Sequence, residues 1–135
     1  MPRPVRFLAG LAAGLVVGLI VFEALLAGFE LLTPTTEIGP ALAQGEGLSL
    51  NLIASLLAFW LLAATASASL ATAITGWSVT GWLAGLCWLV TITLVAGLGG
   101  LTDLTIATAI VAGTAGTAIG IRLAQIADAE NGLPD

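Results

Sequence analysis

The chain has 135 residues, of which 59% are hydrophobic and 8% are charged, and its mean hydropathy is +1.11. A soluble domain of this length needs a largely polar surface, which so few charged residues could not supply. Three Arg, no Lys and no His also leave too few cations to neutralise nucleic-acid phosphates. The composition therefore predicts a small integral membrane protein and excludes nucleic acid as a partner.

The first apolar segment, residues 7–32, is long enough to cross a bilayer, because a hydrocarbon core of about 30 Å needs about 20 helical residues. Pro2 and Pro4 are expected to keep the residues before this segment out of the helix. The Thr33-Pro34 pair ends the helix, because a residue that precedes proline is disfavoured in the helical region. We therefore predict a first transmembrane helix over residues 7–32.

Three further apolar segments follow a longer loop. Residues 33–47 contain two prolines, three glycines and two acids, which favours an irregular outer loop. Ser49 is a plausible N-cap of the second helix, and Asp103 is interpreted as the N-cap of the last. The predicted helices cover residues 48–74, 79–98 and 104–126, with a polar, frayed tail over residues 127–135. The predicted fold is an all-α membrane protein: a four-transmembrane-helix bundle with short turns and one longer outer loop.

The positions of the arginines predict the orientation. Arg3 and Arg6 precede the first helix, Arg122 lies near the end of the last, and the 33–47 loop has no basic residue. Because positive residues concentrate on the cytoplasmic side, both termini are expected in the cytoplasm, in a bacterial inner membrane. Trp77 and Trp82 would then lie near the cytoplasmic interface, where tryptophan is enriched.

Small residues recur at helical spacing on three of the predicted helices. Such residues let helix backbones approach closely, which drives association in lipid. The first and last stripes could pack against each other inside the bundle or face a neighbouring protein, and packing inside the bundle is the more common case. The predicted packing positions are Gly10, Gly14, Gly18, Gly81, Gly85, Ala112, Gly116 and Gly120.

Glu23 is the one acid embedded well inside an apolar segment. It follows Gly14 by nine residues, a rotation of about 180°, so it faces away from the glycine stripe. Glu30, seven residues further on, lies on the same side as Glu23. Acids inside membranes commonly mark functional sites. No basic residue within the apolar segments can pair with Glu23, so it is protonated, hydrated or bound to a cation, or it bonds to hydroxyls of neighbouring helices.

The sequence offers no catalytic or metal-binding set. There is no His or Lys, and the single Cys87 lies in an apolar run, where a buried, inert thiol is expected. We therefore predict no enzymatic activity, no metal and no required cofactor, although the glycine faces could seat a lipid, a quinone or a carotenoid.

Two resemblances follow from particular residues. Glu23, the segment Phe59-Trp60-Leu61-Leu62-Ala63, Trp77 and the Asp103-Leu104 start of the last helix resemble the small multidrug resistance exporters. That resemblance implies a four-helix dimeric exporter that exchanges protons for cationic drugs at Glu23, with Trp77 in the binding site. The chain departs from that family in its long 33–47 loop and its lack of tyrosine.

The second resemblance rests on the glycine-rich first helix with its embedded acid and on the ending Gly120-Ile121-Arg122-Leu123-Ala124. These features resemble uncharacterised small bacterial four-helix membrane proteins, which implies a fold and no function. From all of these observations we expect a non-enzymatic accessory or structural subunit. It would pack against other membrane proteins, itself or lipid through its small-residue faces. The alternative is a small proton- or cation-coupled exporter with Glu23, Glu30 and Trp77 at its site.

Overall fold

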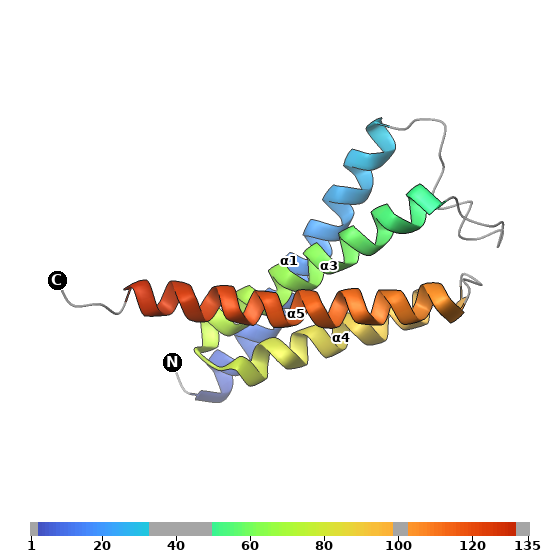
Figure 1. The fold of residues 1–135 in the computed structure, drawn as a ribbon. Helices are drawn as coiled ribbons and strands as arrows, with labels where there is room; N and C mark the ends of the chain where they lie inside the picture. Colours follow the sequence, from blue (N-terminus) through green and yellow to red (C-terminus); the bar gives the residue numbers. More distant parts are fainter. Residues whose placement is uncertain (1–2, 33–49, 99–102, 132–135) are drawn as a thin grey trace.

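The computed structural model describes residues 3–32, 50–98 and 103–131, and these residues form four α-helices (Figure 1). Each helix is long and apolar enough to cross a membrane. At this level the predicted all-helical fold is confirmed, while the predicted outer loop 33–47 and the predicted cap Ser49 lie outside the described residues. The helices are α1 (Arg3–Leu32), α3 (Leu50–Thr75), α4 (Ser78–Leu98) and α5 (Asp103–Asn131).

Two predicted helix ends are wrong. α1 begins at Arg3 and includes Pro4. Proline is tolerated in a first helical turn, where the missing N–H would have no partner within the helix in any case. α5 continues through residues 127–131, which were predicted to be a frayed tail. Alanine and glutamate are strong helix formers, so Ala127, Ala129 and Glu130 extend the helix despite their position beyond the apolar segment.

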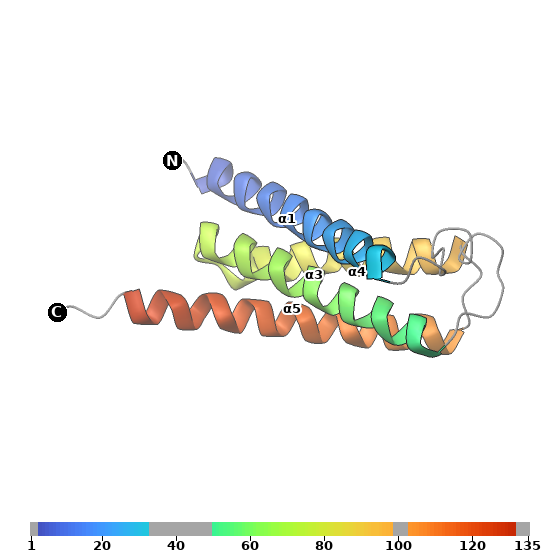
Figure 2. The same ribbon diagram turned by 90° about the horizontal axis from the view of Figure 1, so that it is seen from above.

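α3 is the central helix, and two glycines of α1, Gly10 and Gly14, and two of α5, Gly116 and Gly120, pack against it (Figures 1 and 2). A Cβ atom added to Gly14 would lie 2.6 Å from the carbonyl oxygen of Ser67 on α3. One added to Gly120 would lie 3.0 Å from the amide nitrogen of Ser69 on the same helix. These glycines of α1 and α5 therefore contact α3 from different sides, and the two helices do not pair through them.

The small residues of α3 make this double contact sterically feasible. Its face toward the neighbouring helices is formed by side chains no larger than threonine, so two backbones approach it closely. Larger side chains fill the core nearer the start of α3, where Leu52, Leu56 and Trp60 are buried. The small buried residues of α3 are Ala63, Ala64, Ser67, Ala68, Ala71, Thr72 and Thr75.

The glycines of α4 take part in the same close packing. Gly81 is buried against Thr72 of α3 and Ile121 of α5, and Gly85 is buried against Thr117 of α5. Of the predicted packing positions, only Ala112 is partly exposed. These seven buried glycines are therefore used for contacts inside the chain.

A tight turn connects α3 to α4 as the sequence predicts. Gly76 has a φ of 73°, a conformation that L side chains rarely adopt, and its N–H donates to the Thr72 carbonyl at 2.7 Å. The Thr75 hydroxyl accepts a hydrogen bond from the Trp77 N–H at 3.1 Å. Nearby, Arg6 of α1 donates from Nε to the Ile74 carbonyl at 2.6 Å, which satisfies one of the free carbonyls at the end of α3.

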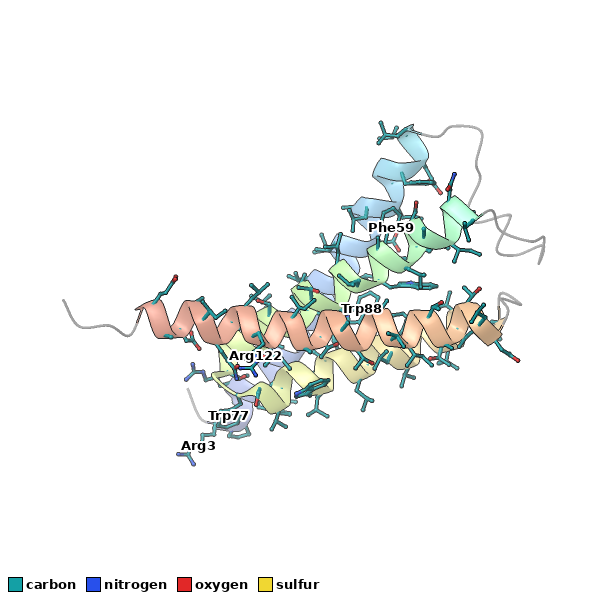
Figure 3. All side chains as sticks on the ribbon, viewed as in Figure 1. Arg3, Phe59, Trp77, Trp88 and Arg122 are labelled. Atoms are coloured by element: carbon teal, nitrogen blue, oxygen red, sulfur yellow. The ribbon has the colours of Figure 1, made fainter. Side chains whose placement is uncertain are left out.

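The start of α1 at Arg3 and the end of α5 lie at one end of the bundle, together with Trp77 and Arg122 (Figures 1 and 3). We call this the arginine end. From it, α1 and α3 run side by side and lean away from α4 and α5 toward the opposite end (Figure 1). The three-helix contact of α1, α3 and α4 is where the candidate site is found.

Candidate functional site

Glu23 lines a small cavity between α1, α3 and α4. The cavity has a volume of about 170 Å³ and an almost wholly apolar lining. Glu23 is its only ionisable residue, and two tryptophans from two other helices complete it. The lining residues are Leu19, Phe22, Glu23, Trp60, Trp88, Thr91, Ile92 and Val95.

Trp88 is held in place by a glycine of α1. A Cβ added to Gly18 would lie 2.7 Å from Cε2 and 2.9 Å from Cζ2 of the indole, so the ring lies directly on the α1 backbone. The Phe22 ring tilts against the same indole, with centroids 6.2 Å apart and an interplanar angle of 46°. Trp88 is only 7% exposed, and its buried Nε1 has no hydrogen-bond partner among the described residues. Its role in the site is therefore shape and π surface.

The length of α4 shows how far Glu23 lies from the middle of the bundle along the helix axes. α4 has 21 residues, about 31 Å, which matches the thickness of a hydrocarbon core. Trp88 is the middle residue of α4, and Gly18 lies at its level. Glu23 follows Gly18 by five residues, so it lies about 7 Å from the midpoint, toward the end opposite the arginines. If the bundle spans a membrane, this carboxyl group is well inside the hydrocarbon core.

No basic group compensates Glu23. Its side chain is exposed and makes no hydrogen bond or ion pair with any residue in the described helices. Arg6 precedes it by 17 residues, about 25 Å along α1. Thr91 is the other polar residue of the cavity, and its hydroxyl already donates to the Cys87 carbonyl at 2.9 Å. A cavity lined by one carboxyl group and two indole rings is a combination that suits cations, through charge and through cation–π contact.

The other two predicted site residues lie elsewhere. Glu30 is exposed on the same side of α1 but does not line the cavity. Beside it, Phe29 packs edge-on against Phe59 of α3, with centroids 5.9 Å apart. Trp77 is 43% exposed in the α3–α4 turn at the arginine end (Figure 3) and does not line the Glu23 cavity. The structure therefore brings Glu23 together with Trp60 and Trp88, and not with Trp77.

Sequence reasoning missed Trp60 and Trp88 as site residues, although one signal pointed to them. Trp77 and Trp82 lie near a helix end, as interfacial tryptophans do. Trp60 and Trp88 lie inside their apolar segments, far from any helix end. A tryptophan at that depth has no water to satisfy its N–H, which suggests a packing or binding role.

Among the described residues, Cys87 and Asp103 add nothing to this site. Cys87, expected to be buried, is exposed on α4, because it lies on the side of the helix opposite Gly85, which faces α5. Asp103 is the first residue of α5, where its charge complements the positive end of the helix dipole. Within the described helices, no group of three or more His, Cys, Asp or Glu side chains could hold a metal ion.

Comparison with known proteins gives no assignment: no protein-family model, no curated protein and no solved structure matches this chain.

Proposed function

We propose that the four helices span a membrane with the arginine end in the cytoplasm. Large apolar side chains are exposed on every helix, which suits a lipid environment and not water. The three arginines lie together at one end, and the positive-inside rule favours the cytoplasm for that end. The membrane of a bacterial cell is the setting that fits the second resemblance described above.

We further propose that the protein is a non-enzymatic membrane subunit whose α1 helix contacts another membrane chain around Glu23. One observation carries this proposal: Glu23 is exposed on α1 and has no partner in the described helices. Ionisable residues inside membranes almost always face a protein interior or a water-filled cavity, because contact with lipid is costly. A second membrane chain against this face would remove Glu23 from lipid.

The burial of α1 supports the same proposal. In the most apolar stretch of each helix, 17% of the residues of α1 are buried, compared with 44% in α3, 33% in α4 and 39% in α5. α1 is thus the helix with the most surface left for a partner. The glycine stripes, from which the sequence alone suggested a partner surface, are buried inside the chain. The partner surface is therefore the Glu23 side of α1.

The test is the mass of the assembly in its own lipid. The full chain is extracted from its membrane in polymer-bounded discs and its mass is measured by native mass spectrometry. We expect a complex larger than one chain, which Glu23→Leu weakens because the polar contact is lost. Glu30→Leu is the matched control, since Glu30 lies on the same side but outside the cavity. A single chain with no associated protein would contradict the proposal.

A second candidate function is a small cation-coupled carrier that uses Glu23. The specific observation in its favour is that the carboxyl group of Glu23 and the indoles of Trp60 and Trp88 line one cavity. Such a cavity suits a small organic cation, because the acid supplies charge and the rings supply cation–π contact. At about 170 Å³ it would hold only part of a drug-sized molecule, so a larger ligand requires the second chain as well.

A further inference from the structure

A second cavity lies between α4 and α5 at the arginine end. Its volume is about 420 Å³, within the range of small-molecule sites. Unlike the Glu23 cavity, it has a mixed lining in which a cation, an amide and a hydroxyl lie beside an indole. The lining residues are Ser78 and Trp82 from α4, and Ala118, Ile121, Arg122 and Gln125 from α5.

Arg122 lacks an anionic partner among the described residues. It makes no hydrogen bond or ion pair with any residue in the described part of the chain. The described acids nearest to it along α5, Asp128 and Glu130, lie about 9 Å and 12 Å further along the helix axis. A guanidinium group with neighbouring amide and hydroxyl donors is the donor set that binds a phosphate group. Trp82, 46% exposed at the same cavity, is typical of the membrane–water interface.

A separate apolar groove lies further along the same pair of helices. It has a volume of about 270 Å³ and is lined by Leu89, Val90, Thr93 and Leu94 of α4 and Ile110 of α5. The Thr93 hydroxyl donates to the Leu89 carbonyl at 2.8 Å, so the groove offers no free donor. Seven residues separate Trp82 from Leu89, a rotation of about 700° that returns to the same side of α4.

The distance along α4 from the polar cavity to the apolar groove is similar to the length of a lipid acyl chain. Along α4, Leu89 lies about 10 Å and Leu94 about 18 Å from Trp82. One leaflet of a bilayer core is about 15 Å thick, half of about 30 Å. Because the midpoint of α4 is Trp88, a molecule whose phosphate lies at Arg122 would reach the apolar groove with the far part of an acyl chain, at this midpoint and just beyond it.

We propose that the α4–α5 seam binds an anionic phospholipid. Arg122, Gln125 and Ser78 hold the phosphodiester, Trp82 packs at the glycerol level, and an acyl chain occupies the groove beside Val90. The proposal rests on the helices spanning a membrane with the arginine end at its surface. It does not depend on a partner chain at Glu23. The apolar groove favours a lipid over a free phosphate ion, which would use the polar cavity alone.

The experiment measures lipid retention by native mass spectrometry of the full chain in mild detergent. Phosphatidylglycerol and phosphatidylcholine with identical acyl chains are added in equal amounts. We expect the wild type to retain more phosphatidylglycerol, and Arg122→Gln to reduce this preference on the order of tenfold, the loss of one charge-assisted hydrogen-bonded contact. Arg3→Gln is the matched control, because it removes the same charge at the same end but not from the cavity.

Further variants separate the two parts of the site. Val90→Trp fills the apolar groove and should lower phosphatidylglycerol retention, whereas Val16→Trp, similarly exposed but on α1 and outside both cavities, should not. Gln125→Leu removes a donor without changing charge and should lower the preference as well. Helicity is checked by circular dichroism for every variant.

Three results would overturn the proposal. One is equal retention of the two lipids by the wild type, and another is unchanged preference in both Arg122→Gln and Gln125→Leu. The third is displacement of the lipid by equimolar inorganic phosphate, which would assign the cavity to a free ion. Any of these would leave the proposed contact at Glu23 unaffected, since that contact is tested by the mass of the protein assembly.

Discussion

The indole of Trp88 on α4 lies directly on the backbone of Gly18 on α1, at the midpoint of α4. This contact places the Glu23 side chain, five residues further along α1, at the edge of a cavity walled by Trp88 and Trp60. It also ties together the two helices of the site that are furthest apart in sequence. The register of α1 against α4 therefore decides whether the candidate site exists.

Gly18→Ala should destabilise the bundle, because its new Cβ would lie 2.7–2.9 Å from Trp88 ring carbons. We expect a loss of about 1–3 kcal/mol, the usual cost of overpacking. Gly28→Ala is the control, since nothing lies within 4 Å of a Cβ at that position, and it should be neutral or stabilising. The measurement is unfolding of the purified protein by a denaturing detergent. Equal stability of the two variants would show that α1 does not pack on Trp88.

The contact of α5 with α3 should tolerate even less change. A Cβ at Gly120 would lie 3.0 Å from the Ser69 amide nitrogen and 3.1 Å from the Thr65 carbonyl carbon, and a helix backbone cannot rotate away. Gly120→Ala should therefore separate the two helices and cost about 1–3 kcal/mol or more. Gly97→Ala, with nothing within 4 Å, is its control. Thermal unfolding followed by circular dichroism distinguishes the two, and a neutral Gly120→Ala would contradict the central position of α3.

Trp88 should be replaceable by another ring but not by a small side chain. Trp88→Ala removes most of a buried side chain and should cost about 3–5 kcal/mol. Trp88→Phe should cost much less, because the ring contact remains and an unpartnered buried N–H, whose burial costs about 1–3 kcal/mol, is removed. The measurement is again detergent-induced unfolding. If phenylalanine were as damaging as alanine, the indole N–H would have to make an essential contact.

Glu23 should be the residue that controls cation binding, if the carrier function holds. Tetraethylammonium is the probe, and its binding is followed by quenching of tryptophan fluorescence. We expect Glu23→Gln to abolish the quenching, since the amide lacks the charge that holds the cation. Glu30→Gln, outside the cavity, should bind as the wild type does. Equal binding by wild type and Glu23→Gln would exclude the carrier.

The sequence predicted the positions of the four helices well, but it did not predict which helices pack against each other. Spacing alone identified Gly10, Gly14 and Gly18 as residues that approach another helix, because small residues at this period have few other uses in lipid. It did not identify α3 as the partner of Gly10 and Gly14 or α4 as the partner of Gly18, since a stripe specifies close approach and not its partner. Pro4 and residues 127–131 were assigned by composition, which is weak at helix ends, where first-turn proline and exposed alanine are both tolerated.

Of the candidate site, the sequence predicted Glu23 but not the two tryptophans that line the cavity with it. A lone acid in an apolar segment is visible in any sequence, so Glu23 was found. Its companions Trp60 and Trp88 come from two other helices, and only the packing of α1 against both brings them to it. Trp77 was carried over from a resemblance, and it lies at the arginine end because a tight turn at Gly76 places it there.

The most direct test of the proposed partner contact is site-specific photo-crosslinking in cells that naturally make the protein. A benzophenone side chain replaces Ala27, which is exposed on α1 one turn from Glu23, or Val90, which is exposed on α4. We predict a crosslink to a second membrane chain, either this one or another, from position 27 and only lipid adducts from position 90. Only lipid adducts from position 27 would contradict the central claim that another membrane chain covers Glu23.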